Sequence, residues 1–186
     1  MVSESNPFSP SEIDVYSHYI GTKISKVRWA NEQAFRHESL TFCVASWGAG
    51  SQGNSVKLYQ CNSSRNFDTT EIPDWNVHLV HSTPHQGDVT DLVFLDASHI
   101  FTSSSNGYVN IYSINHEPGN SKKSLILKKS RRHHGNITSN MECTAISLQP
   151  NTSQPDLVSV GLDGNIVTTK FERDELTVIG KILSNN

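Results

Sequence analysis

The sequence predicts an all-β fold built from repeated, four-stranded antiparallel units. Three observations support this class: apolar residues alternate with a period of two, one strand pattern recurs three times, and tight turns follow it at fixed offsets. Helical periodicity is absent apart from an ambiguous stretch at residues 11–19. The chain is therefore expected to form sheets throughout.

Each unit opens with a strand whose first, fourth and sixth positions are apolar. The three sets are Ile24, Val27 and Trp29; Val89, Leu92 and Phe94; and Cys143, Ile146 and Leu148. The large residue that closes each set, Trp29, Phe94 or Leu148, is expected to lie in the core.

A second strand rich in serine and small residues follows each first strand, at residues 42–47, 100–104 and 157–161. Tight turns come next, at Gly53-Asn54, Asn106-Gly107 and Asp163-Gly164. Asn-Gly and Asp-Gly pairs favour hairpins because both residues tolerate positive φ. Third strands then resume at 56–59, 109–112 and 166–169, and fourth strands are expected at 76–81, 124–129 and 176–183. Four short antiparallel strands per unit are typical of a β-propeller blade.

The repeats divide the chain into an N-terminal extension, 1–20, and three blades at 21–83, 84–132 and 133–183. Polar insertions at 62–73, 115–123 and 135–140 account for the unusual length of the units. Three blades cannot close a ring. We therefore expect the outer faces of the first and third blades to be open and to promote self-association.

Composition narrows the possible partners of the 186-residue chain. The hydrophobic fraction of 35% and charged fraction of 18% indicate a globular protein, and the net charge of −3 predicts no direct nucleic-acid partner. No apolar run approaches the ~18 residues that span a bilayer, so no direct membrane insertion is expected. The cysteines lack C-x-x-C spacing and fit reduced, buried thiols of the cytosol or nucleus.

The histidines suggest no metal site. His78 and His81 should point to opposite faces of a strand, and no cysteine or carboxylate at ligand spacing joins them or His85. His133 and His134 follow a run of lysines and arginines, and we interpret them as a solvated loop face. The sharper alternative is a basic patch for nuclear import or an acidic partner.

Catalysis is not predicted. Ser103, His85 and Asp163 could be assembled into a triad on paper, but serine-rich second strands recur in every unit. No nucleophile elbow and no glycine-rich phosphate loop are present, so neither enzymatic activity nor a cofactor is expected. Among the other aromatic residues, Trp47 is expected to pack, and Trp75 could be an exposed interface anchor.

The pattern resembles the WD-repeat family in a degenerate form. His85 stands four residues before Val89, where that family has its signature histidine, whereas Tyr59-Gln60, Tyr112-Ser113 and Thr169-Lys170 replace the closing Trp-Asp pair. The hydrogen-bonded His–Ser–Asp–Trp network typical of the family is therefore expected to be incomplete in every blade.

Three segments, at 23–29, 85–92 and 158–166, resemble more specifically the N-terminal half of a WD-repeat nucleoporin of the Y-shaped nuclear pore complex. That resemblance implies part of a seven-bladed ring and a scaffold role in transport of RNA and protein. The implied partners are the large α-solenoid and WD-propeller subunits of the complex. It also implies location at the nuclear envelope and pore, with a kinetochore role in mitosis.

A second reading is a WD-repeat adaptor that captures a peptide or histone tail in a ubiquitin-ligase or chromatin complex. Such adaptors bind at the mouth of a closed ring, which three blades alone do not form.

Overall fold

A computed structural model of the chain describes residues 17, 19–30, 39–50, 53–63, 75–116 and 123–183. Most of the expected extension at 1–20, most of the insertion at 62–73 and much of that at 115–123 lie outside these residues. So does most of the ambiguous stretch at 11–19.

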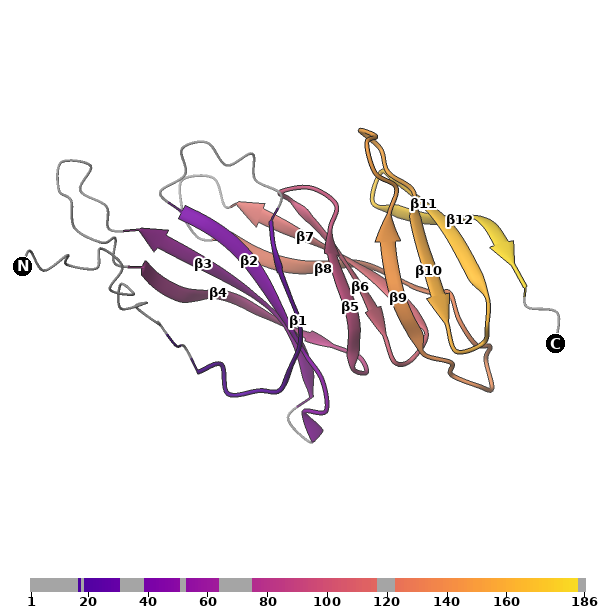
Figure 1. Cartoon of the computed structure of the whole chain (residues 1–186), viewed down its shortest axis with the longest axis horizontal. Helices are drawn as coiled ribbons and strands as arrows, with labels where there is room; N and C mark the ends of the chain where they lie inside the picture. The colour runs from indigo at the N-terminus through magenta and orange to yellow at the C-terminus, as the bar shows by residue number, and fades with distance from the viewer. Residues whose placement is uncertain are drawn as a thin grey trace, which may run out of the picture.

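Twelve strands form three separate four-stranded antiparallel sheets, and each sheet uses four consecutive strands in order (Figure 1). The first sheet contains β1 (Ile24–Trp29), β2 (Ser39–Ser46), β3 (Asn54–Ser63) and β4 (Trp75–His85). The second contains β5 (Val89–Phe94), β6 (His99–Ser104), β7 (Tyr108–His116) and β8 (Lys123–Arg132). The third contains β9 (Cys143–Leu148), β10 (Leu157–Gly161), β11 (Ile166–Glu172) and β12 (Glu175–Ile182). The predicted all-β class and the three blade-like units are confirmed.

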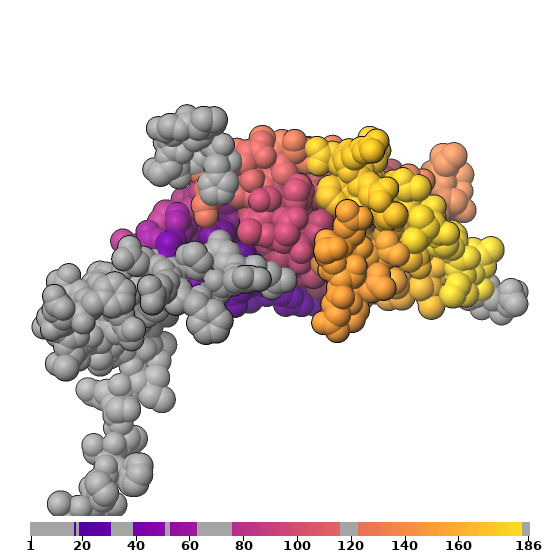
Figure 2. All heavy atoms as spheres, turned by 90° about the horizontal axis from the view of Figure 1, so that it is seen from above, coloured from indigo at the N-terminus to yellow at the C-terminus, as the bar shows by residue number. Residues whose placement is uncertain are grey.

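The sheets follow one another along the long axis of the molecule, in chain order from one end to the other (Figure 2). β5 contacts β1 on one side and β9 on the other, so the first strands of the three sheets lie next to each other. β4 extends to His85, past the expected boundary between residues 83 and 84. The division at 84 and at 133 stays a prediction.

The hairpin turns form at the predicted residues, but their backbone geometry differs from the one expected. Gly107 N donates to Ser104 O at 3.0 Å, and Gly164 N donates to Gly161 O at 3.0 Å. Both glycines have positive φ, 81° and 70°, whereas Asn106 and Asp163 do not. These are turns with glycine in the last position, which only glycine fills without steric strain.

Two apolar clusters hold the sheets together, one at each junction. Between the first and second sheets, buried residues of β2 and β3 pack against residues of all four strands of the second sheet. Between the second and third sheets, Phe101, Val109 and Ile111 pack against Cys143, Ile146, Leu157 and Leu176. We call the two faces of a sheet its front and its back, such that at both junctions the back of one sheet packs on the front of the next.

Candidate functional site

His85 belongs to two sheets at once. Its backbone pairs with Asn54 at the end of β4, while its imidazole lies in the second sheet. Nε2 is 3.1 Å from Thr102 Oγ1 and 3.0 Å from Asn110 Nδ2, and Nδ1 is 2.9 Å from the carbonyl oxygen of Gly87. Burial lowers the pKa of His85, against the opposing effect of the Gly87 carbonyl. The neutral ring donates to Gly87 and accepts at Nε2, which ties the first sheet to the second.

A longer polar chain runs through the third sheet. His134 Nδ1 lies 2.8 Å from Asp163 Oδ1, and its Nε2 lies 3.1 Å from Ser159 Oγ. His133 Nδ1 lies 2.8 Å from the same hydroxyl, and its Nε2 lies 3.2 Å from Thr169 Oγ1. Ser159, Thr169 and His134 are fully buried and His133 is nearly so. All five side chains therefore form one connected network inside the molecule.

The carboxylate fixes the direction of every proton in this network. Because Asp163 accepts from His134 Nδ1, the Nε2 atom of the neutral ring accepts from the Ser159 hydroxyl. The Ser159 oxygen then accepts from His133 Nδ1, and His133 Nε2 accepts from the Thr169 hydroxyl. Each donor has an acceptor when both histidines are neutral.

The electrostatics of the network agree with that assignment. Burial is the main cause that lowers the pKa of His133 to about 4, and the positive charges of Arg131 and Lys181 act in the same direction. Burial alone would raise the pKa of Asp163, but hydrogen bonds from His134, from the Gly135 and Asn165 amides and from the Asn165 side chain hold that pKa well below its usual range. Asp163 is thus ionised and His133 neutral near pH 7.

The prediction that His133 and His134 form a solvated or basic face is wrong. The residues from 135 to 140 make a small loop closed by a bridge between Gly135 and Asn140. This insertion moves His134 to nine residues before Cys143, whereas His85 stands four residues before Val89. The sequence signal for His134 is a histidine before the first strand of the unit. Recognising it requires allowing a loop between the histidine and the strand.

The side chains of Ser103, His85 and Asp163, the hypothetical triad considered above, do not contact one another. Ser103 Oγ lies 2.7 Å from Thr90 Oγ1, while His85 and Asp163 have the partners given above. Ser159, His134 and Asp163 do follow the order of a nucleophilic triad, but Ser159 is fully buried and out of reach of a substrate. The arrangement serves to join strands.

The His–Ser–Asp–Trp network typical of WD repeats is incomplete in each sheet, and the replaced residues differ from sheet to sheet. In the second sheet Asn106 replaces the aspartate, and in the third Thr169 stands at the tryptophan position. In the first sheet Val44 takes the place of Thr102 and Ser159, and Lys57 that of Asn110. Lys57 Nζ donates instead to Ile20 O at 3.2 Å.

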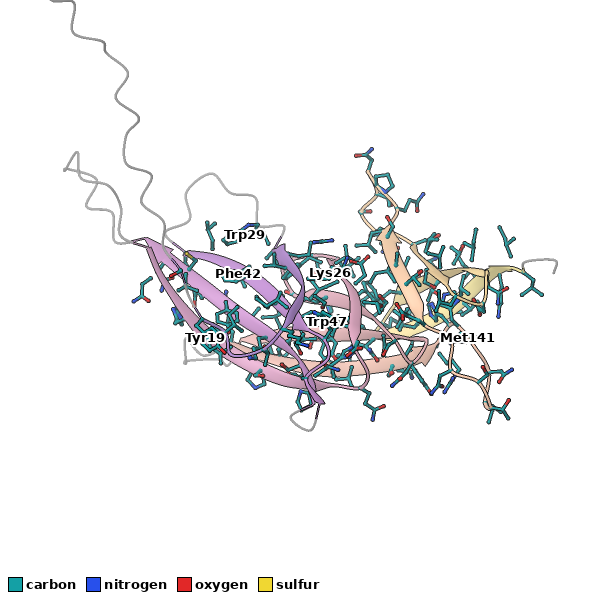
Figure 3. All side chains as sticks on the ribbon, turned by 60° about the horizontal axis from the view of Figure 1, so that its bottom comes forward. Tyr19, Lys26, Trp29, Phe42, Trp47 and Met141 are labelled. Carbon is teal, nitrogen blue, oxygen red and sulfur yellow. The ribbon has the colours of Figure 1, made fainter. Side chains whose placement is uncertain are left out.

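The three first-strand residues expected in the core have different surroundings. Phe94 is 3% exposed in the first junction, and Leu148 is half-buried beside the second. Trp29 is 57% exposed, which corrects the prediction that it lies in the core. It lies on the front face of the first sheet, against which no other described sheet packs. There it contacts Phe42, which stacks on Tyr59 (Figure 3).

Trp47 is 47% exposed, so the expectation that it packs is also wrong. Lys23 Nζ lies 5.3 Å from the centre of its ring. Beside it is a groove of about 520 Å³ at the starts of the first strands, with Asp88, Glu142, Thr90 and Thr144 among its lining residues. Trp75 lies in β4, but its side chain is outside the described part.

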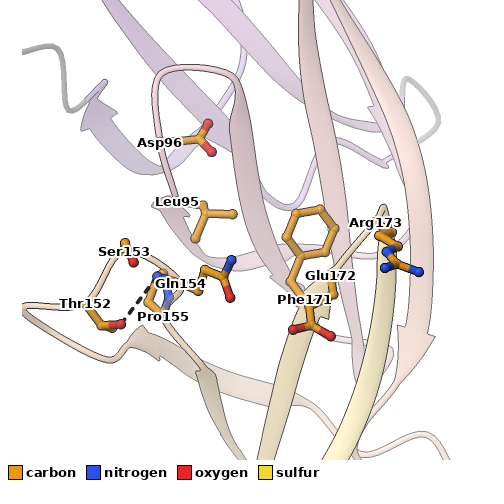
Figure 4. A pocket seen from close by; sticks show the side chains of 9 residues that line it. All are labelled: Leu95, Asp96, Thr152, Ser153, Gln154, Pro155, Phe171, Glu172 and Arg173. Atoms are coloured by element: carbon orange, nitrogen blue, oxygen red, sulfur yellow. Dashed lines mark hydrogen bonds between the residues drawn. The ribbon is translucent and has the colours of Figure 1, made fainter.

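A second groove, of about 490 Å³, lies between the second and third sheets (Figure 4). Leu95 and Phe171 supply its apolar surface, and Asp96, Glu172 and Arg173 supply charges at its margin. The ring of Phe171 contacts the ring of Phe101 edge-on and the ring of His99 at a tilt.

Within the described ranges, no group of three or more histidine, cysteine or acidic side chains is arranged to hold a metal ion. In the same part of the chain, no helix has the length and apolar character needed to cross a membrane. Cys43, Cys61 and Cys143 are free thiols, and burial raises the pKa of Cys143 to about 12.

No protein-family model matches the chain. A crystal structure of Sqt1 from Saccharomyces cerevisiae overlaps 77% of the chain and 45% of that protein, at 15% identity and a TM-score of 0.47.

Nucleoporin Nup43 of mouse and of human each share 28% identity with the chain over 168 residues. The match covers 87% of the chain and 42% of each relative, so the chain spans less than half of their length. The nucleoporin resemblance seen in the sequence is thereby confirmed: over most of its length, the chain is distantly similar to Nup43.

Proposed function

We propose that the chain is a non-catalytic scaffold component of the Y-shaped complex of the nuclear pore. The observation that carries the proposal is the similarity to Nup43 over 87% of the chain. The proposed partners are the large α-solenoid and propeller subunits of that complex. The proposed locations are the nuclear envelope and pore, with the kinetochore in mitosis.

The geometry suits a rigid docking body. Buried polar chains at His85 and His134 join strands of the second and third sheets, and apolar clusters fill both junctions. Binding to such a body requires little ordering of the scaffold, so a few anchors suffice for affinity. Trp47 and the groove beside it offer one such anchor on the surface.

The alternative function, a WD-repeat adaptor that binds a peptide or histone tail, would use the same groove. An exposed tryptophan next to Asp88 and Glu142 is chemically suited to a basic side chain of a peptide. The two readings differ in what the groove binds: a folded nucleoporin surface or a short basic segment.

The test is quantitative affinity purification of the tagged full chain from cells, with imaging of the same fusion. Recovery of Y-complex subunits and a signal at the nuclear rim is the expected result. Recovery of histones or a ubiquitin-ligase core, without Y-complex subunits, overturns the scaffold proposal and supports the adaptor. Trp47→Ala should weaken binding through the groove, and Ile137→Ala, at a 99% exposed loop position, is the matched control.

A further inference from the structure

The outer strand of the second sheet holds every lysine and arginine of that sheet's strands. Five of the ten residues of β8 are basic and none is acidic, while β5, β6 and β7 contain no lysine or arginine. The outer strand of the first sheet, β4, has no lysine, arginine, aspartate or glutamate, and β12 of the third sheet has one glutamate and one lysine. Charge is therefore not a shared means of protecting the outer edges of these sheets, and β8 is the exception.

Most of the positive charge of β8 is not neutralised by the chain. Lys129 Nζ lies 2.7 Å from Glu175 Oε2 of β12. Among the described residues, no other basic side chain of β8 contacts a carboxylate. Arg131 donates to the backbone carbonyl of Leu176, two others bond to uncharged oxygens, and Lys128 has no hydrogen bond or ion pair. Lys128 and Arg131 are also exposed, so the strand presents cations that an external partner can pair.

A β-bulge sets Lys128 apart from the other residues of the strand. The residues on either side of it pair with consecutive residues of β7, so Lys128 is an extra residue without a partner there. Bulges bend a strand and change the direction of the side chain they carry. The bulges of β4 and β12 fall at Val80 and Ile179. Lysine therefore stands at the bulge of the second sheet, where the other two sheets have apolar residues.

Two exposed apolar side chains precede these charges on the same strand. Ile126 is 42% exposed and Leu127 is 45% exposed. Charge alone suffices to protect an edge, so this protection does not account for open apolar side chains beside it. No residue of β8 is aromatic, and single-stranded nucleic acids are bound by stacking bases on aromatic rings as well as by charge. The mixture of cations and aliphatic groups favours a polypeptide partner.

The position of β8 keeps its outer edge apart from the two ends of the row of sheets. It is the last strand in the order β5-β6-β7-β8, and in the described ranges it pairs with β7 only. Its neighbours are β4 of the first sheet and β12 of the third. A further blade would lie beyond the first or the third sheet, so it would not cover this edge.

We propose that β8 is a docking site for an extended, acidic polypeptide segment. Carboxylates of that segment pair with Lys128 and Arg131, and an apolar side chain between them covers Ile126 and Leu127. Complementary charges of this kind raise the rate of association and select the partner. The inference does not rest on the proposed nucleoporin function.

The experiment is a fluorescence anisotropy titration with the purified full chain. The probe is a labelled synthetic peptide in which single leucines separate pairs of glutamates. Saturable binding that weakens as the salt concentration rises is the expected result, because exposed charges are screened. A matched peptide with glutamine in place of glutamate should bind much more weakly. Absence of binding, equal binding of the glutamine peptide, or affinity that does not change with salt overturns the proposal.

Substitutions on β8 locate the site. Lys128→Glu should weaken binding about fivefold, because it removes one attraction and adds one repulsion. Leu127→Ser should also weaken binding but leave its dependence on salt unchanged. Lys23→Glu is the matched control: it makes the same charge change at an exposed lysine beside Trp47, in the first sheet. Its affinity should stay within about twofold of the unaltered chain, because distant exposed charges are screened.

Circular dichroism of each variant should match that of the unaltered chain, since neither Lys128 nor Leu127 is buried. Equal losses in Lys128→Glu and Lys23→Glu would mean that the peptide responds to overall charge, which overturns the site. Tighter binding of an oligothymidylate than of the acidic peptide would identify a nucleic-acid surface and overturn the polypeptide partner. None of these outcomes bears on whether the chain co-purifies with nucleoporins, so the two proposals fail separately.

Discussion

The backbones of Gly107 and His134 are joined by a hydrogen bond where the second sheet meets the third. The Gly107 carbonyl oxygen accepts the backbone N–H groups of His133 at 2.9 Å and His134 at 3.1 Å. A β-carbon at Gly107 would overlap the carbonyl oxygens of His134 and Met141. This close approach, together with positive φ, explains why the turn needs glycine at this position.

Gly107→Ala should therefore lower the free energy of unfolding by about 2–4 kcal/mol, since left-handed strain and a backbone clash add. Gly53→Ala is the control, because Gly53 also has positive φ but nothing lies within 4 Å of its added β-carbon. It should cost about 1–2 kcal/mol. Urea unfolding of both variants measures the difference, and equal losses would show that the close approach is relieved at little cost.

Asp163→Ala should destabilise the chain by about 1–3 kcal/mol, because it leaves the buried His134 Nδ1–H without its acceptor. Asp96→Ala is the comparison, because the hydrogen bond between Asp96 and His99 is exposed to solvent. This substitution should cost less than about 1 kcal/mol. Urea denaturation at pH 7 distinguishes them. A loss at Asp163 no greater than at Asp96 would contradict the network described for the third sheet.

Stability should fall as the pH is lowered from about 6.5 to 4. The pKa of His133 is about 4 in the folded chain, against 6.5 for a free histidine, so the unfolded chain binds the proton more readily between these two values. The stabilisation is complete above pH 6.5 and is lost as the pH falls through this window. The expected loss is about 3 kcal/mol.

Urea unfolding as a function of pH checks this window. His133→Gln should reduce the dependence between pH 6.5 and 4, and the part that remains should come from His85, whose pKa burial also lowers. His78→Gln, at an exposed histidine of β4, should leave the dependence in place. Asp163 loses its stabilising effect only at lower pH, because hydrogen bonds hold its pKa far down. Unchanged pH dependence in His133→Gln would assign the effect to other groups.

Phe94→Ala should cost about 3–5 kcal/mol, as expected for a buried aromatic side chain whose removal leaves a cavity. Leu127→Ala is the control on the same sheet, since Leu127 pairs with Tyr112 but is largely exposed. It should cost less than about 1 kcal/mol. Thermal or urea unfolding reports both values, and a loss under about 1 kcal/mol for Phe94→Ala would place its side chain outside the junction.

The strands could be predicted from the sequence because their signals are local. Alternation and the glycine turns at 107 and 164 depend on neighbours in the chain, and β7 and β11 form where those signals placed them. Burial is not local. Trp29 and Phe94 have the same position in the same pattern, but only Phe94 has a sheet in front of it.

The polar network was missed for a related reason. His133 and His134 follow four basic residues, and that context suggested a solvated face. Their burial depends on Ser159, Thr169 and Asp163, which are 25 to 36 residues away. A sequence pattern read within a short window does not contain those partners.

His85 has a consequence for the order of events during synthesis. Its backbone completes the first sheet, but the side-chain partners Thr102 and Asn110 lie 17 and 25 residues farther along the chain. At about 5–20 residues per second, the ribosome adds that stretch in a few seconds. The ring of His85 therefore reaches its buried state only after the second sheet has been synthesised, so completion of the second sheet also completes the attachment of the first.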